Sequence, residues 1–180
     1  MGRGVGEIIH WADCDAPIGR IRIASTQRGL VYIELPNANG RGLRGWLRRH
    51  AAGAEFQNSA EHNSTYVTQI REYFAGEREQ FDFPLDIRAT EFQRDVYAEV
   101  GRIPYGHQRS YGEIAEAVGR PKAVRAVGAA NGANPVPLVV PCHRVIASNG
   151  NLHGYGGGVP LKARLLAMES SSAAANGRLL

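Results

Sequence analysis

The segment of residues 139–146 constrains this chain most strongly. A cysteine, a histidine and an arginine occupy consecutive positions 142–144, directly after Pro141 and between two apolar runs. One interpretation is a buried strand with a packed cysteine, since free cysteine is among the most often buried residues. The adjacent His143 and Arg144 count against it, because both side chains need solvent or a partner. The alternative is a thiolate nucleophile that other parts of the chain must activate and supply with substrate.

Composition sets the frame for this segment. The chain has 180 residues, of which 43% are hydrophobic and 21% are charged, which is typical of a soluble globular protein with one large or two small domains. No apolar run approaches the roughly 20 residues that span a bilayer, and residues 1–7 lack the apolar core of a secretion signal. Cys14 and Cys142 form no disulfide framework. We therefore expect a cytoplasmic protein without a membrane partner, in which the thiol stays reduced.

The formal charge of +4 is concentrated in one part of the chain. Residues 101–146 carry six basic side chains and two acidic ones, an excess as large as that of the whole chain. This region is the candidate face for a polyanion such as nucleic acid, and the alternative is an ordinary solvated basic surface. The residues counted are Arg102, Arg109, Arg120, Lys122, Arg125 and Arg144 against Glu113 and Glu116.

The first half of the sequence predicts a small α+β unit. Alternation of apolar and polar residues in 18–24, a turn at 27–29 and the apolar run 30–35 indicate an antiparallel hairpin. Helical spacing follows in 43–50, and a second helix begins after Asn63 or Ser64 and ends at Gly76. Residues 51–61 are expected to be a loop, and residues 80–86 a last strand or an extended linker. No clustered titratable residues or metal-ligand spacing stands out, so we expect a supporting role and no metal site.

The second half predicts a helix-turn-helix. Thr90 with Gln93 and Ser110 with Glu113 are capping boxes that begin two helices, and Gly119 is a natural end for the second. Pro121 suits the first turn of a third helix that runs to about residue 131. Two short helices joined by a tight turn containing glycine are typical of DNA-binding proteins.

The third predicted helix is built of small residues. Only Lys122 and Arg125 offer long donors, whereas a helix that reads DNA sequence normally presents several. A thin helix of this kind suits backbone or shape recognition, with a narrow minor groove as its site. The alternative is an alanine helix packed inside the domain.

Three further segments flank the cysteine. Residues 131–137 form a hinge of Asn, Gly and Pro, and residues 153–158 a glycine-rich loop where a ligand could approach the backbone closely. A last helix is expected over 161–168, ending at Glu169, and the small polar tail 170–180 is expected to be disordered.

A thiol of ordinary pKa near 8.5 needs a base or a cationic neighbour to act as a nucleophile. His143 is adjacent, but neighbouring side chains of an extended segment point to opposite faces, so a direct bond needs a bend or an intervening water. His143 also needs a carboxylate to fix its tautomer. Glu169 is the best candidate, because Glu113 and Glu116 lie on the predicted helix-turn-helix.

Five motifs together resemble the active-site region of the O6-alkylguanine-DNA alkyltransferases, in that family's order and spacing between residues 90 and 169. They are residues 110–115 (SYGEIA), 125–128 (RAVG), 134–135 (NP), 141–146 (PCHRVI) and 165–169 (LLAME). The resemblance implies an α+β fold: a small α/β, ribonuclease H-like domain over 1–86, then a mainly helical domain with a winged helix-turn-helix over 87–169, and a flexible tail over 170–180.

The resemblance also implies a DNA repair enzyme, a methylated-DNA–protein-cysteine methyltransferase. It would take the alkyl group from O6-alkylguanine, and from O4-alkylthymine, after flipping the base through the minor groove. The implied roles are attack by Cys142, proton uptake by His143 through water, orientation of His143 by Glu169, and base rotation and proton donation by Tyr111. Arg125 would fill the vacated stack, with Lys122, Ala126 and Tyr111 also on DNA. The substrate pocket would comprise Asn134, Val145, Tyr155, Gly156 and Gly157.

The product of such a transfer is a thioether, which has no good leaving group. We therefore expect one transfer per molecule and no cofactor.

The expected partner is double-stranded DNA bound by a monomer, with cooperative binding left open. Gly156, Gly157 and Gly158 lack larger side chains, which predicts a roomy pocket. A transcription regulator and a cysteine hydrolase are weaker alternatives, because base-reading side chains and an oxyanion motif are lacking.

Overall fold

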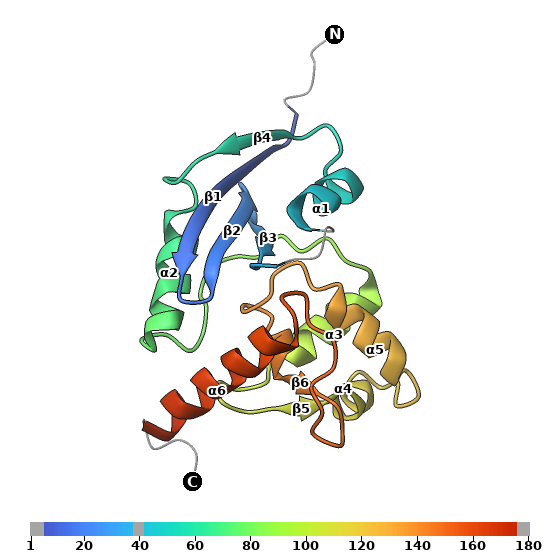
Figure 1. Ribbon diagram of the computed structural model, residues 1–180. Helices are drawn as coiled ribbons and strands as arrows, with labels where there is room; N and C mark the ends of the chain where they lie inside the picture. Colours follow the sequence, from blue (N-terminus) through green and yellow to red (C-terminus); the bar gives the residue numbers. More distant parts are fainter. Residues whose placement is uncertain (1–5, 38–41, 176–180) are drawn as a thin grey trace. The chain divides into compact units, whose positions relative to one another are not determined.

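A computed structural model describes residues 6–37 and 42–175 (Figure 1). The chain divides into two compact units, Met1–Arg88 and Ala89–Leu180. This boundary lies two residues beyond the expected one at 86/87. Among the described residues, no helix is long and apolar enough to cross a membrane.

The first unit is built on a mixed four-stranded sheet in the order β3-β2-β1-β4. The strands are β1 (Ile8–Ala16), β2 (Gly19–Thr26), β3 (Gly29–Glu34) and β4 (Glu55–Asn58), and its helices are α1 (Gly42–His50) and α2 (Ser64–Ala75). The antiparallel β2–β3 hairpin is confirmed, with Ile23 opposite Ile33. Strand β4 lies in the expected loop and pairs in parallel with β1. The sequence did not reveal it because its burial is slight and its neighbours are small and polar.

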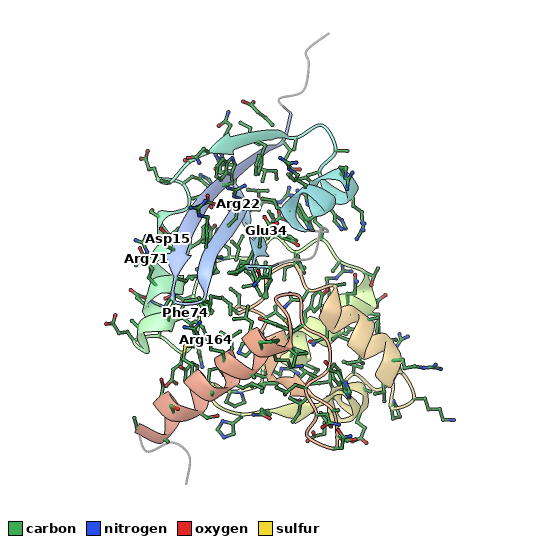
Figure 2. The ribbon with its side chains drawn as sticks, viewed as in Figure 1. Asp15, Arg22, Glu34, Arg71, Phe74 and Arg164 are labelled. Atoms are coloured by element: carbon green, nitrogen blue, oxygen red, sulfur yellow. The ribbon has the colours of Figure 1, made fainter. Side chains whose placement is uncertain are left out.

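The sheet carries one helix on each face, as Figure 1 shows. Ile9 of β1 packs with Leu43 and Trp46 of α1 in one cluster, on one face of the sheet. Successive residues of a strand point to opposite faces. Cys14 is five residues after Ile9 in β1 and therefore points to the other face, where its thiol interacts with Arg71 of α2. Figure 2 labels Arg71.

Three details of this unit bear on what the sequence predicted. Asn63 precedes α2 but makes no side-chain cap, because its amide bonds with Ser25 Oγ and Ser59 O instead. Gly76 ends the helix with left-handed backbone, φ 76°, as expected. Residues 80–86 form no regular strand, and only Leu85 makes a bridge to Leu30, so the extended-linker alternative describes this segment.

The second unit is mainly helical. Its elements are α3 (Glu91–Gly101), β5 (Arg109–Ser110), α4 (Tyr111–Ala117), α5 (Val124–Gly132), a 3-10 helix η1 (Cys142–Arg144), β6 (Val145–Ile146) and α6 (Val159–Ala175). Both predicted capping boxes are present, at Thr90 with Gln93 and at Ser110 with Glu113. The short β5 and β6 pair in parallel. Helices α3, α4 and α5 pack against one another, which gives the helix-turn-helix expected from the sequence.

Two of the helix boundaries predicted for this unit were wrong. Helix α5 begins at Val124 rather than Pro121, because the turn after Gly119 continues through a bond from Ala123 N to Arg120 O. Helix α6 runs to Ala175 rather than ending at Glu169, so residues 170–175 are helical and not disordered. The reason is tertiary packing, since Ala173 is buried and its Cβ lies where a side chain on Gly106 would stand. Residues 176–180 of the expected tail lie outside the described residues.

Candidate active site

Cys142 lies at the start of the 3-10 helix η1, not in a strand. Its side chain is only 4% exposed. The helix is closed by hydrogen bonds from Arg144 N to Pro141 O and from Val145 N to Cys142 O. Burial raises the pKa of the Cys142 thiol to about 11, although interactions with the Asn134 side chain and the Lys162 charge oppose this shift. The resting group is therefore a neutral thiol at pH 7.

His143 and Glu169 form a fully buried pair. His143 Nε2 lies 2.8 Å from Glu169 Oε1, and both side chains are 0% exposed. Burial lowers the pKa of His143 despite this carboxylate, so the imidazole is neutral at pH 7. Burial would raise the pKa of Glu169, but the hydrogen bonds from His143 and Arg144 outweigh it and hold that pKa far below its usual value. An ionised carboxylate only accepts hydrogen bonds, so Nε2 carries the proton and Nδ1 has the free lone pair.

Nδ1 of His143 is buried and has no hydrogen-bond partner in the described chain. Within the same residues, no hydrogen bond joins the Cys142 thiol to the His143 imidazole. Adjacent residues of a 3-10 helix project about 120° apart, so the turn does not bring the two groups into direct contact. The bond through an intervening water that the sequence suggested therefore remains a prediction.

Arg144 completes the group around Glu169. It was counted toward the candidate polyanion face, but it is buried, so it forms an ion pair with Glu169 instead. Its Nε donates to Glu169 Oε2 at 2.8 Å and its Nη2 to Oε1 at 2.9 Å. Nη1 also donates to Ile103 O at 2.7 Å, and Gly106 N donates to Glu169 Oε2 at 3.2 Å. The carboxylate of α6 thus holds η1 and the 103–106 segment together. Glu113, the alternative carboxylate, caps α4 instead.

The turn that leads to Cys142 is held by Asn134. Its Nδ2 donates to Val140 O at 2.7 Å, and its Oδ1 accepts from Val136 N at 3.0 Å. Within this turn Leu138 has left-handed backbone, φ 77°, although it is a buried leucine. Non-glycine residues rarely adopt this conformation, so the surrounding contacts must compensate for the strain. The sequence pointed to the Asn-Gly pair, not to Leu138.

Tyr111 opens α4 and is connected to the cysteine through Asn131. The Asn131 side chain interacts with Tyr111 and donates from Nδ2 to Cys142 O at 3.1 Å. Burial raises the pKa of the Tyr111 phenol, which keeps its proton at neutral pH. Asn131 is 5% exposed and was not singled out in the sequence, because its partner lies in a different element.

The loop between β6 and α6 contributes Tyr155, Gly156 and Gly157. The Tyr155 and His143 rings meet edge to face with centroids 6.4 Å apart, and the Tyr155 hydroxyl is buried without a partner in the described residues. Gly156 is exposed and Gly157 buried. Val145, at the start of β6, is fully buried.

Helix α5 exposes the small-residue face that the sequence predicted. Val127, Ala130 and Asn131 are buried, whereas Arg125, Ala126 and Ala129 are exposed. Lys122 is also exposed but lies in the turn before the helix. The helix is anchored by Tyr97, whose hydroxyl donates to Ala130 O at 3.1 Å. Its outer face is therefore thin and basic.

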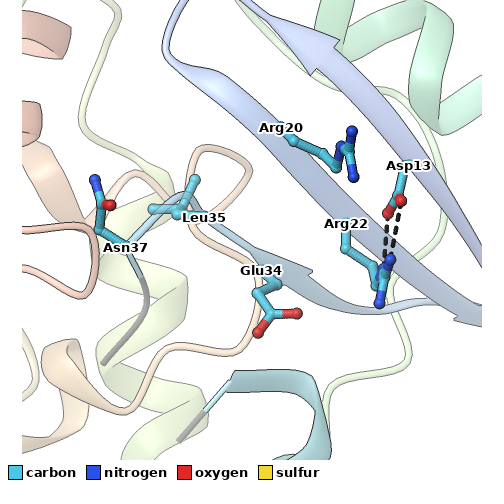
Figure 3. Close-up of a pocket in the computed structure, with 6 residues that line it drawn as sticks. All are labelled: Asp13, Arg20, Arg22, Glu34, Leu35 and Asn37. Carbon is cyan, nitrogen blue, oxygen red and sulfur yellow. Dashed lines mark hydrogen bonds and ion pairs between the residues drawn. The ribbon is translucent and has the colours of Figure 1, made fainter. Parts of the chain in front are cut away.

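The first unit contains polar clusters that the sequence did not predict. A pocket of about 280 Å³ is lined by Asp13, Arg20, Arg22, Glu34, Leu35 and Asn37 (Figure 3). Arg22 and Asp13 satisfy each other there with bonds of 2.7 and 2.9 Å. His10 and His62 stack with ring centroids 4.0 Å apart. Among the described residues, no three His, Cys, Asp or Glu side chains are grouped to hold a metal ion.

Comparison with known proteins covers both units. Residues 91–171 match the family model of the 6-O-methylguanine DNA methyltransferase DNA-binding domain, and residues 9–87 that of its ribonuclease-like domain.

Relatives match over nearly the whole chain. The methylated-DNA–protein-cysteine methyltransferase of Mycolicibacterium paratuberculosis is 46% identical over 165 residues, which are 90% of this chain and 93% of that protein. The inducible enzyme of that name from Bacillus subtilis is 43% identical and covers 82% of each chain. The structure of Mycobacterium tuberculosis OGT in complex with DNA superposes with a TM-score of 0.79 at 41% identity, covering 91% of this chain and 94% of that one. The chain therefore belongs to the 6-O-methylguanine DNA methyltransferase family.

Proposed function

We propose that this protein repairs alkylated DNA by transferring the alkyl group from O6 of guanine to Cys142. The observation that carries the proposal is a buried thiol next to a buried, neutral His143 that is held by Glu169. Relatives with the methyltransferase name and a relative in complex with DNA support the same function.

The transfer is a displacement at carbon. The sulfur of Cys142 forms a bond to the alkyl carbon as the bond from that carbon to O6 breaks, and the electron pair passes into the guanine ring. The thiol proton moves through a water to Nδ1 of His143, which is neutral and has a free lone pair. Tyr111, whose raised pKa keeps it protonated, donates to N3 of the departing guanine. Both groups return to neutrality through solvent after the base leaves.

Glu169 orients this base rather than taking the proton. Its low pKa makes it a poor proton acceptor, whereas its charge stabilises the imidazolium that forms on His143. Asn134 and Asn131 fix the backbone on either side of Cys142, so that the sulfur is positioned before the substrate arrives.

DNA is expected to lie against α5. Arg125 and Lys122 would contact phosphates or enter the stack, and the small side chains of Ala126 and its neighbours would allow a close approach to the minor groove. The target base must leave the helix to reach a thiol that is only 4% exposed, which costs a few kcal/mol and least for a damaged base.

The proposed substrate pocket comprises Asn134, Val145, Tyr155, Gly156 and Gly157. Backbone groups of the glycine segment would contact the base edge, and the missing side chains leave space for alkyl groups larger than methyl, and for O4-alkylthymine. We further propose that the protein acts in the cytoplasm, once per molecule, and binds DNA as a monomer or cooperatively.

Mass spectrometry of the protein after incubation with O6-methylguanine DNA tests the proposal. We expect a single added methyl group on the peptide that contains Cys142, and none in Cys142→Ala. The matched control is Cys14→Ala, which removes the only other cysteine and should still be methylated. Methylation elsewhere, or none in the wild-type protein, would refute the assignment. DNA binding retained by Cys142→Ala would separate binding from chemistry.

A further inference from the structure

Lys162 is a fully buried cation that the proposed transfer does not use. It lies on α6 and is 0% exposed, although lysine is almost never fully buried unless it is paired. The chain's 21 basic residues include only two lysines, Lys122 and Lys162. The position therefore holds an ammonium group in a protein whose basic residues, apart from Lys122, are otherwise arginines.

The partners of this ammonium are backbone carbonyls. Nζ donates to Val145 O at 2.6 Å and to His153 O at 3.0 Å. It also lies 5.7 Å from the centroid of the Tyr111 ring. A compact ammonium with three donors suits converging carbonyls better than the planar guanidinium fork, which matches carboxylates and phosphates.

The two carbonyls belong to the two ends of one loop. Val145 is in β6, three residues after Cys142, and His153 opens the glycine segment 153–158. Between them the loop is held by bonds of its own, from Ala147 N to Asn151 O and from Gly150 N to Ala147 O. Lys162 thus fastens the start of the glycine segment to the segment that contains the cysteine, at a point buried from solvent.

We propose that Lys162 is a positioning residue for alkyl transfer, whose ammonium group holds the glycine segment 153–158 against the segment of Cys142. This inference rests on the proposed function, because the glycine segment is the proposed wall of the substrate pocket. In the proposed transfer, Lys162 contacts neither the sulfur of Cys142 nor the alkylated base. It sets the position of Tyr155 and Gly156, which lie two and three residues after His153.

If the Lys162 ammonium group acts as a clamp, which means that it holds segment 153–158 against the segment of Cys142, its loss has other effects than the loss of a residue that only stabilises the fold. Loss of stability alone lowers the fraction of folded protein and leaves the transfer rate of the folded, DNA-bound protein unchanged. Loss of the clamp leaves the affinity for DNA unchanged, because α5 is remote in sequence and keeps its own anchor through Tyr97. It lowers the single-turnover rate at saturating DNA, since misplacing groups around a reacting centre by about 1 Å can cost up to 100-fold.

The test compares Lys162→Met with Arg164→Met, which removes a charge from an exposed site on the same helix, labelled in Figure 2. Single-turnover transfer from O6-methylguanine DNA, the dissociation constant for that DNA and hydrogen exchange of the 153–158 amides are measured on folded protein. For Lys162→Met we expect a rate lowered on the order of tenfold or more, an unchanged dissociation constant and faster exchange in 153–158. Arg164→Met should match the wild type in all three.

A Lys162→Met rate within twofold of wild type would overturn the inference, as would an equal loss in both variants. If Lys162→Met does not fold, Lys162→Gln takes its place. It keeps N–H donors without the charge and should lower the rate more than twofold, and a rate within twofold of wild type would count against the inference. Failure of the wild-type protein itself to transfer the alkyl group would instead refute the proposed function.

Discussion

At the residue scale, the central feature is a nucleophile that burial keeps inactive until a base acts on it. With a thiol pKa of about 11, only about one molecule in 10⁴ carries the thiolate at pH 7. His143, whose pKa is lowered by burial, is neutral and able to accept the proton throughout the neutral range. The buried Glu169 and Arg144 keep that base in one tautomer.

This arrangement predicts a specific pH profile for single-turnover transfer. In the wild type the rate should stay flat from neutral pH to below 6.5, the ordinary pKa of histidine, because the pKa of His143 is lowered. It should fall only at a lower pH, where His143 becomes protonated and can no longer accept the thiol proton. In His143→Asn the rate at pH 7 should fall by about 10²- to 10⁴-fold. It should then rise tenfold per pH unit toward a thiol pKa of about 11. Equal profiles for the two proteins would exclude His143 as the base.

Gly156 offers a test of the roomy pocket. A Cβ built on Gly156 meets no atom within 4 Å, and its φ is not in the left-handed region, so Gly156→Val should fold with an unchanged melting temperature. Its side chain would occupy space that a large alkyl group needs. We expect the ratio of benzyl to methyl transfer rates to fall about tenfold or more in this variant. An unchanged ratio, or no benzyl transfer by the wild type, would contradict the roomy pocket.

Single residues differ in how far the sequence reveals them. Cys142, His143, Glu169 and Tyr111 stand in recognisable motifs, and the structure brings them into one region. Lys162 and Asn131 bond to backbone carbonyls of other elements. Every residue has a backbone carbonyl, so the residue types along the sequence could not indicate which carbonyls these side chains bind.

At the scale of elements, α5 is the proposed contact with DNA. Its exposed face is small and basic, and its buried face carries Val127 and Ala130. The packed-helix alternative from the sequence therefore describes the buried side of α5, and contact of the exposed side with DNA stays a prediction.

Arg125 and Lys122 predict separable effects on DNA binding. Lys122→Ala should weaken binding to any DNA sequence and reduce the slope of log affinity against log salt by about 1, because one phosphate contact is lost. Arg125→Ala should in addition slow transfer from a paired lesion more than from the same lesion in single-stranded DNA, since only the paired base must leave a stack. Fluorescence anisotropy over a salt series and single-turnover rates measure the two. Equal slowing on both substrates would exclude a role of Arg125 in base flipping.

The elements were predictable where local chemistry decides them. Both capping boxes and the Gly76 and Gly119 helix ends follow from side chains within a few residues. Strand β4 and the last turns of α6 were missed because partners distant in sequence stabilise them. Ala173, for example, is helical because it packs against the Gly106 turn, which a Ser- and Ala-rich tail does not reveal.

At the scale of the whole molecule, the chain consists of two units with separate cores. Both tryptophans, Trp11 and Trp46, lie in the first unit, whereas Cys142 and its partners lie in the second. Tryptophan fluorescence therefore reports unfolding of the first unit alone, and hydrogen exchange of the α3 amides reports the second.

The buried pair predicts acid sensitivity of the second unit. Below pH 6.5 the histidine of the unfolded chain binds a proton, whereas native His143, with its lowered pKa, stays neutral. The free energy of unfolding therefore decreases as the pH is lowered. Below pH 4.5 the same holds for Glu169, whose native pKa is depressed. In His143→Gln the α3 amides should lose the dependence between pH 6.5 and 4.5, while the tryptophan signal keeps the wild-type pH dependence. An unchanged dependence of the α3 amides would show that His143 is not buried as a neutral group.

Cys142 is proposed to accept the alkyl group and to keep it. A titration of a fixed amount of protein with an excess of O6-methylguanine DNA, with the loss of methylated guanine counted over time, tests it directly. We predict a plateau at one methyl group per protein molecule, because a thioether has no good leaving group and the thiol is therefore not regenerated. Continued loss of methylated guanine beyond one equivalent would show that Cys142 does not keep the alkyl group.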